Sequence, residues 1–239
     1  MIKAYHRVKT LQEALDLTAR PGIKTAVLYG YDAQVTEDTD EVVDLQAISL
    51  NPITVGDETA VIGALTPLQT IVEAETLPSW LRTLAQQAGP STFRHMRTLG
   101  HLLTHLDSES LLLAALIATQ VQVTVVWKGG ETTVSIGSFL EGIEGIIVSV
   151  TVPLVGRLET AHVARTPADQ PIVGAVAYHQ PNGAIALVLT GVASLPVMSD
   201  PMSLDSLTPP SDFRGSAAYR KDMAAVLTRR VLAQLGVAE

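Results

Sequence analysis

The chain has 239 residues, of which 47% are hydrophobic and only 4% aromatic, and its formal net charge is −8. This length is compatible with one large domain or two smaller ones, and a core of mostly Leu, Val, Ile and Ala is typical of mixed helix and sheet proteins. The acidic balance disfavours nucleic acid and anionic membranes as partners, and the absence of cysteine excludes disulfides, cysteine nucleophiles and iron–sulfur clusters ligated from within this chain.

The first ten residues lack the apolar stretch of a signal peptide, and later apolar runs fall short of the roughly 20 residues of a spanning helix, so a cytoplasmic protein with no membrane segment is expected. Thr10 can cap a helix that Pro21-Gly22 ends. A short strand over residues 23–28 then leads into residues 29–34, a turn-forming segment at a strand end, where ligand loops are common. A tight turn with Gly30 at positive φ is an equally good interpretation.

The rest of the chain alternates between strand and helix patterns. Strands are predicted over residues 42–45, 48–50, 53–55, 60–65, 121–127, 132–136, 146–152, 172–178 and 184–191, and helices over residues 78–87, 111–118 and 217–235. Glycines mark the hairpins, and Asn182-Gly183 predicts a type I′ turn. Residues 199–212, rich in Pro and Ser, are expected to form a surface linker. A boundary near Val152 would divide the chain into two domains.

Residues 94–118 are the most informative stretch, because a polar segment with two histidines runs directly into an apolar one. The pattern indicates a site-forming loop that leads into a buried helix. A nucleotide loop, a metal site and a loop without a ligand all remain open. His101 and His105 would share one face of a helix, yet no third metal ligand is evident. No metal ligand is therefore assigned. No nucleophile elbow occurs, so no catalytic residue is assigned, and neither a Rossmann nor a Walker glycine motif is present.

Several local strings, in their order along the chain, resemble one family, the FAD-binding (medium) subunits of molybdenum hydroxylases of the carbon monoxide dehydrogenase and xanthine dehydrogenase type. These strings are YHR at residues 5–7, LQEAL at 11–15, IGALT at 62–66, TLG at 98–100, ARTPAD at 164–169 and DFRGSAAYR at 212–220. The resemblance therefore covers nearly the whole chain, and its last two strings are individually specific.

The resemblance implies an α+β fold in two parts. Residues 1–152 would form an FAD-binding domain of the vanillyl-alcohol-oxidase or PCMH type, itself made of two α+β lobes. Residues 153–239 would form a small α+β domain like the C-terminal domain of carbon monoxide dehydrogenase flavoproteins. In such a family FAD takes electrons from a partner iron–sulfur small subunit, in a complex with a molybdopterin-binding large subunit, and passes them to an acceptor. The lack of cysteine fits this division of labour.

The resemblance also places the FAD contacts on two turns. The first turn comprises Leu28, Tyr29, Gly30, Tyr31, Asp32 and Ala33, where the family has AGGTDL, and the second comprises Thr98, Leu99, Gly100 and His101, where the family has TIGG followed by Asn. One glycine of each motif is therefore replaced, by Tyr29 and by His101. A family aspartate falls at about Leu111 and a family lysine at about His162.

These replacements matter because a pyrophosphate needs close approach to backbone N–H groups, which a tyrosine at a glycine position obstructs. Two hypotheses therefore stay open. The chain is either a working flavin subunit, or a degenerate relative that has lost FAD and serves as a structural or interaction subunit.

Overall fold

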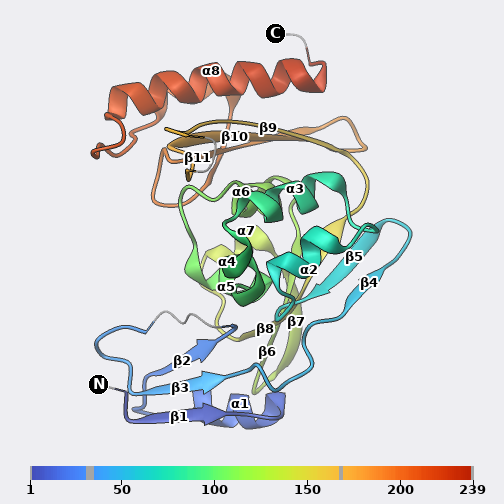
Figure 1. Ribbon diagram of the computed structural model, residues 1–239, viewed down its shortest axis with the longest axis vertical. Helices are drawn as coiled ribbons and strands as arrows, with labels where there is room; N and C mark the ends of the chain where they lie inside the picture. Colours follow the sequence, from blue (N-terminus) through green and yellow to red (C-terminus); the bar gives the residue numbers. More distant parts are fainter. Residues whose placement is uncertain (1, 31–34, 167–168, 238–239) are drawn as a thin grey trace.

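The computed structural model describes residues 2–30, 35–166 and 169–237, which form three layers along the long axis of the molecule (Figure 1). An N-terminal lobe lies at one end, a middle lobe follows, and a C-terminal unit with a long helix lies at the other end. The mixed α+β class and the smaller C-terminal unit are confirmed. None of the helices within the described ranges combines the length and hydropathy needed to span a bilayer.

The N-terminal lobe is a three-stranded parallel sheet in the order β1 (Ala4–Arg7), β3 (Glu41–Asp44), β2 (Thr25–Leu28), joined by helix α1 (Leu11–Thr18). As predicted, α1 is capped by Thr10, whose hydroxyl accepts a hydrogen bond from the Glu13 amide at 3.1 Å. β2 ends at Leu28, so the first turn leaves the carboxyl end of this strand.

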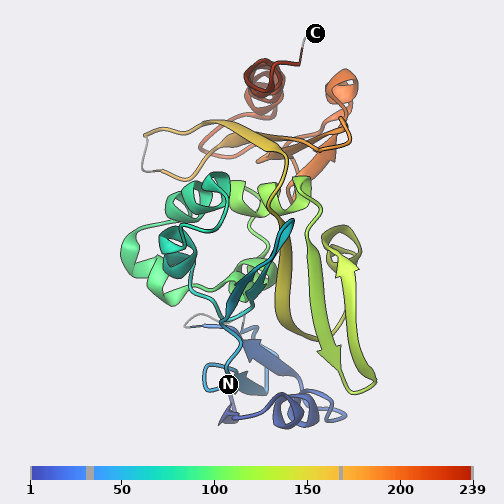
Figure 2. The ribbon, with the colours of Figure 1, turned by 90° about the vertical axis from the view of Figure 1, so that its right-hand side faces the viewer.

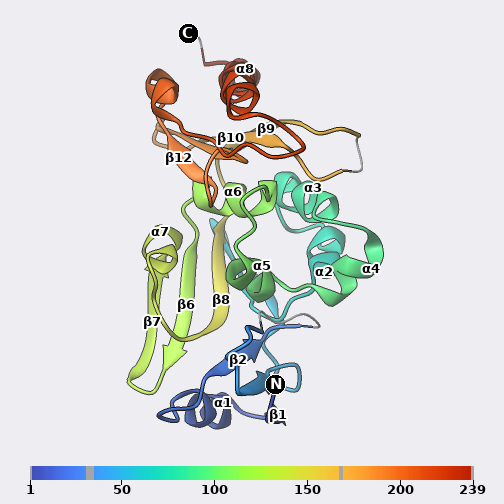
Figure 3. The ribbon, with the colours of Figure 1, turned by 90° about the vertical axis from the view of Figure 1, so that its left-hand side faces the viewer.

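The middle lobe is built on a five-stranded antiparallel sheet, and Figure 3 shows α2, α4 and α5 on one side of it. The strands, in spatial order, are β4 (Ile53–Val55), β5 (Thr59–Gly63), β8 (Ile146–Pro153), β6 (Gln122–Trp127) and β7 (Gly130–Ser135). The helices are α2 (Leu68–Glu73), α3 (Ser79–Gln87), α4 (Ser91–Met96), α5 (Leu99–His105), α6 (Leu111–Ala118) and α7 (Ile136–Leu140). All residues of α6 are buried, because it packs on β10 and β11 on one side and on α3 and α7 on the other.

The C-terminal unit is a four-stranded antiparallel sheet covered on its outer face by α8 (Ala217–Leu235) and on its inner face by α6 (Figure 2). Its strands, in spatial order, are β12 (Val197–Ser199), β11 (Ile185–Thr190), β10 (Val173–His179) and β9 (Arg157–Val163), and a 3-10 helix, η1 (Pro201–Ser206), precedes α8. Val176, Tyr178 and Val188 of this sheet belong to the middle-lobe core. Because the core is continuous there, the division near Val152 stays a prediction.

Two sequence predictions of local structure are wrong, and both fail through local hydrogen bonds. Residues 48–50 form no strand, because the amides of Ile48 and Leu50 close turns onto the carbonyls of Leu45 and Ile48, at 2.9 and 3.0 Å. The turn before β11 is not type I′, which needs positive φ at both central residues. Only Gly183, at φ 88°, has it, and its amide closes a turn onto the Gln180 carbonyl at 3.0 Å.

Three further segments differ from the predicted pattern. The polar part of residues 94–118 was expected to be a loop, but α4 and α5 fold there as two short helices. β9 was not predicted, because its charged residues at 157 and 159 obscure the strand pattern of an edge strand. Part of the expected linker over residues 199–212 is the 3-10 helix η1.

A buried arginine joins the middle lobe to the start of α8. Arg220 is 1% exposed, and its Nη1 donates to the carbonyls of Ile172 at 2.7 Å and Gly191 at 2.8 Å. Its Nη2 donates to Asp212 Oδ2 at 2.6 Å. The Glu109 carboxylate, on the loop before α6, lies 3.6 Å from Arg220 Nη1. One guanidinium therefore connects the start of α8 to four other positions in the chain, at residues 109, 172, 191 and 212.

This network predicts a loss of stability in acid. The hydrogen bond from Arg220 lowers the pKa of Asp212 to about 2 from its ordinary 3.8. A carboxyl whose pKa is depressed on folding stabilises the protein above its unfolded pKa, and this contribution is lost as pH falls through the folded pKa. We expect the difference in unfolding free energy between the wild type and Asp212→Asn to shrink as pH falls from about 4 to about 2. Urea titrations across this range measure it, and a constant difference would contradict the assignment.

Candidate functional site

The two turns singled out from the sequence lie directly against each other. The Thr98 hydroxyl, which also caps α5, donates to the Tyr29 carbonyl at 2.5 Å. Gly30 is buried, and a Cβ atom at its position would lie 2.7 Å from the Met96 carbonyl oxygen. Gly30 does not have positive φ, so the tight-turn interpretation is wrong and the glycine is needed for close backbone approach. The first turn therefore touches the backbone that leads into α5.

The side chain of Tyr29 fills the space between these turns. It is 2% exposed, and its hydroxyl oxygen accepts a hydrogen bond from the Ile147 amide in β8 at 2.6 Å. The ring lies on α5, since a Cβ atom at Gly100 would be 2.5 Å from Tyr29 Cδ1. Burial raises the pKa of Tyr29, which keeps the phenol neutral. Tyr29 thus contacts two separate elements of the middle lobe.

The backbone amides at the start of α5 are already used within the protein. The Leu99 amide donates to the Thr66 carbonyl at 3.0 Å, and the Gly100 amide donates to the Ala64 carbonyl at 2.7 Å. The next two amides, at residues 101 and 102, donate to the hydroxyl and the carbonyl oxygen of Thr98 at 3.2 and 3.1 Å. Phosphate oxygens are bound by amides that lack an internal partner. The second turn therefore does not fit a pyrophosphate.

Among the predicted site residues that the structure describes, Tyr29, Gly30, Thr98 and Gly100 contact one another between the two turns, and Leu28, Leu99 and His101 are their neighbours in the chain. Leu99 is 0% exposed and belongs to the core. The contacts predicted at Tyr31, Asp32 and Ala33 lie outside the described residues. Whether any of these residues binds a cofactor stays a prediction.

His101 and His105 share one face of α5, as their spacing predicts. Their ring centroids are 5.1 Å apart and the rings are nearly parallel, with 19° between their planes. His101 is buried at 5% exposure. Within the described ranges, no group of three or more His, Asp or Glu side chains is placed to hold a metal ion.

The positions of the family's downstream aspartate and lysine are occupied by Leu111 in α6 and by His162 in the edge strand β9. Leu111 is 6% exposed and packs on β10, where a Cβ atom at Gly174 would lie 2.5 Å from Leu111 Cδ2. His162, in the edge strand β9, is paired with Gly174 of the neighbouring strand β10. A leucine in this position contributes to the core and offers no hydrogen bond to a ligand.

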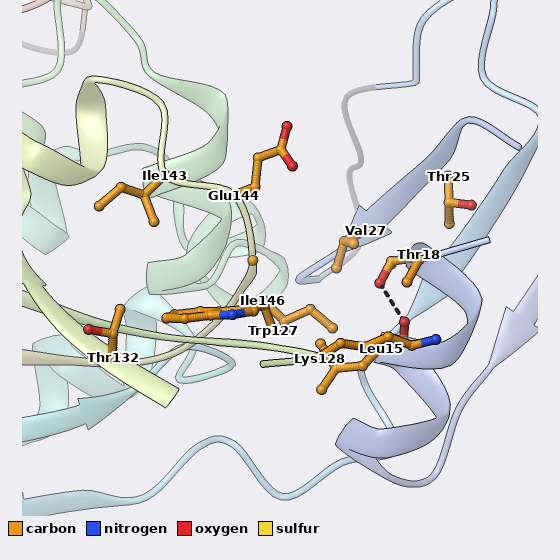
Figure 4. Close-up of a pocket in the computed structure, with 12 residues that line it drawn as sticks. Leu15, Thr18, Thr25, Val27, Trp127, Lys128, Thr132, Ile143, Glu144 and Ile146 are labelled. Carbon is orange, nitrogen blue, oxygen red and sulfur yellow. Dashed lines mark hydrogen bonds between the residues drawn. The ribbon is translucent and has the colours of Figure 1, made fainter. Parts of the chain in front are cut away.

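A pocket of about 650 Å³ lies between the N-terminal and middle lobes (Figure 4). The N-terminal lobe contributes Leu15, Thr18, Ala19, Thr25 and Val27, and the middle lobe contributes Trp127, Lys128, Thr132, Ile143, Glu144, Gly145 and Ile146. Lys128 Nζ lies 3.6 Å from Asp16 Oδ1 across the lobes. Sequence reasoning missed this pocket, because its walls come from segments at least 100 residues apart that carry no motif.

The pocket begins beside the tyrosine contact. Ile146 lines the pocket, and the next residue, Ile147, donates its amide to Tyr29. A volume of this size is within the range of roughly 300–1,000 Å³ found for small-molecule sites.

The chain is similar to one family of known proteins and to a bacterial relative of nearly the same length. The family described as the FAD binding domain in molybdopterin dehydrogenase matches residues 1–155. An uncharacterized protein of Escherichia coli strain K12, YgfM, is 24% identical over 246 residues, which cover 95% of this chain and 94% of that protein.

Solved structures show the same fold. A chain of carbon monoxide dehydrogenase from Hydrogenophaga pseudoflava, in a form that lacks the Mo-pyranopterin moiety, superimposes with a TM-score of 0.87 at 20% identity, covering 98% of this chain and 96% of that one. A chain of quinoline 2-oxidoreductase from Pseudomonas putida 86 has a TM-score of 0.81 at 20% identity, covering 99% and 98%. The expected fold, including its C-terminal antiparallel sheet, is therefore confirmed.

Proposed function

Since the chain belongs to the family of FAD-binding domains of molybdopterin dehydrogenases, we propose that it is a member that keeps the family scaffold without binding FAD between the two turns. It would serve as a structural or interaction subunit. The observation that carries this proposal is the Tyr29 ring, which is buried against Gly100 and hydrogen-bonded to Ile147.

Two independent features of the second turn support this proposal, the contact of the Tyr29 ring with Gly100 and the internal hydrogen bonds of the backbone amides. The ring occupies the place where the phosphates would have to approach Gly100. The amides from residue 99 to residue 102 already donate to protein oxygens, so a pyrophosphate would have to break those bonds before it gained its own. The ring thus takes the space at Gly100, and internal hydrogen bonds occupy the amide donors of the second turn.

A flavin subunit is the second candidate, favoured by family membership and by the pocket beside Ile146. In that case FAD would take electrons from a partner iron–sulfur small subunit and pass them to an acceptor. A dinucleotide could place one end in the pocket, but its phosphates would reach the second turn only after Tyr29 had left its position. This chain would then hold FAD only weakly.

Both candidates imply the same partners. We propose a molybdopterin-binding large subunit and an iron–sulfur small subunit, because the chain has no cysteine with which to hold clusters of its own. Solved relatives with this fold include carbon monoxide dehydrogenases. The partners therefore do not distinguish the two candidates, and FAD binding does.

Restoring glycine at both positions where the family has it should increase FAD affinity. In Tyr29→Gly combined with His101→Gly, we expect the dissociation constant for FAD to fall at least about tenfold, equivalent to 1.4 kcal/mol, because the phosphates regain access to Gly100. The wild type at saturating FAD should show no co-eluting flavin absorbance and no thermal shift.

The control is Tyr5→Gly combined with His179→Gly, which removes the same two residue types from β1 and β10. Its FAD affinity should equal that of the wild type. Flavin bands that co-elute with wild-type protein would refute the proposed function, and no gain in the Tyr29/His101 variant would refute the steric argument.

A further inference from the structure

We infer that Tyr29 is a structural link between the N-terminal and middle lobes, which holds them together from within the protein where a ligand would otherwise bridge them. This inference rests on the proposed function, because a dinucleotide bound to the second turn would need the space that the ring fills. It adds that the tyrosine has a positive role, and is more than an obstacle to FAD.

The position of Tyr29 in the chain makes it suited to this role. It directly follows β2, the strand at one edge of the N-terminal sheet, while its three contacts all belong to the middle lobe. Its carbonyl accepts from Thr98, its ring lies on Gly100, and its hydroxyl accepts from Ile147. Backbone, ring and hydroxyl therefore connect one residue to both α5 and β8.

The Ile147 amide is available to a side chain because β8 is irregular at this point. Thr124 of β6 faces Ser149, and the next residue, Val125, faces Ile147, so β8 contains one extra residue at position 148. Such a bulge takes a backbone group out of the ladder. Ile147 is only 1% exposed, so its amide has to bind a protein atom, and the Tyr29 hydroxyl supplies that atom.

The N-terminal lobe packs on itself through its parallel sheet and α1, and its buried residues Val8, Ala14, Leu15, Val43 and Leu45 belong to the same continuous core as the middle lobe. The ion pair between Lys128 and Asp16 also crosses between the lobes, but both side chains are more than half exposed, and such a pair contributes little. Tyr29 is a stronger link than this ion pair, because its side chain is buried and its hydroxyl accepts a hydrogen bond from the buried Ile147 amide. Tyr29 adds directional hydrogen bonds to the apolar contacts of that shared core, so contacts within the protein join the two lobes without a cofactor.

Residue-resolved hydrogen exchange on the FAD-free full chain tests this inference. In Tyr29→Phe, which keeps the ring, we expect the Ile147 amide to exchange roughly ten- to hundredfold faster, because a buried donor loses its acceptor. In Tyr29→Ala, the sheet β1-β3-β2 should also exchange faster, while the C-terminal sheet exchanges as in the wild type.

The matched control is Tyr178→Phe, since Tyr178 is 4% exposed and its hydroxyl donates to the Val155 carbonyl at 2.7 Å, outside the N-terminal lobe. It should leave exchange in the N-terminal sheet unchanged. If Tyr29→Ala accelerates all three layers equally, or leaves the N-terminal sheet unchanged, Tyr29 is an ordinary core residue and the inference fails.

The exchange experiment still gives an answer if Tyr29→Ala does not fold or if the wild type binds FAD. If Tyr29→Ala does not fold, Tyr29→Phe decides alone, and a wild-type exchange rate at Ile147 would overturn the link. FAD binding to the wild type in a parallel titration would refute the proposed function, whereas the exchange data on FAD-free protein would still decide whether Tyr29 joins the lobes.

Discussion

Replacing Arg220 by alanine should lower the free energy of unfolding by about 3–5 kcal/mol, the range for removing one partner of a buried ion pair. The guanidinium is 1% exposed and donates to two backbone carbonyls, so its loss leaves the oxygens of Ile172 and Gly191 without this donor. Glu109, 7% exposed, would lose one of its two arginine neighbours. For a chain of this size the melting temperature should fall by roughly 6–20 °C.

The matched control is Arg229→Ala, because Arg229 lies on the same helix but is exposed. Its unfolding free energy should stay within about 0.5 kcal/mol of the wild-type value. Urea denaturation followed by circular dichroism measures both variants. A loss for Arg220→Ala of the same size as that for Arg229→Ala would show that the network does not join α8 to the rest of the protein.

The fold was predictable from the sequence wherever local signals dominate. The helix capped by Thr10 and the buried helix α6 were predicted correctly, because capping and burial patterns depend on only a few neighbouring residues. The failures arise where neighbouring hydrogen bonds or edge positions override such patterns. Residues 48–50 are apolar enough for a strand but turn back on themselves, and β9 carries charges that an edge strand tolerates.

The site was predictable only in part. The family strings predicted that Tyr29 and Gly100 lie close together, and the structure shows this contact; that the tyrosine obstructs a cofactor cleft stays a prediction. The sequence could not show what the side chain does there. The hydroxyl of Tyr29 binds the amide of Ile147, which is 118 residues away. The first two amides of α5 donate to the carbonyls of residues 66 and 64. Such partners are set by the tertiary fold, so no pattern within one segment reveals them.

Replacing Gly100 by alanine should destabilise the protein by about 3 kcal/mol, the upper end of the range for overpacking a core. The added methyl would lie 2.5 Å from Tyr29 Cδ1 and 3.0 Å from the Ala64 carbonyl oxygen. The ring cannot move aside cheaply, because its hydroxyl is bound to Ile147. Gly137→Ala is the control, since Gly137 is likewise the second residue of a helix and its nearest neighbour would be 3.8 Å away. This control should be neutral or stabilising.

A double-mutant cycle that combines Gly100→Ala with Tyr29→Ala shows whether contact with the tyrosine ring causes the loss of stability. If the glycine makes room for the tyrosine ring, Gly100→Ala should cost at least about 1 kcal/mol less once the ring is removed, since residues in contact are coupled. If the glycine is retained for the approach of a phosphate, the two substitutions should act additively on the stability of FAD-free protein. Unfolding free energies of the four proteins in this cycle decide between a packing role and a ligand-binding role for Gly100.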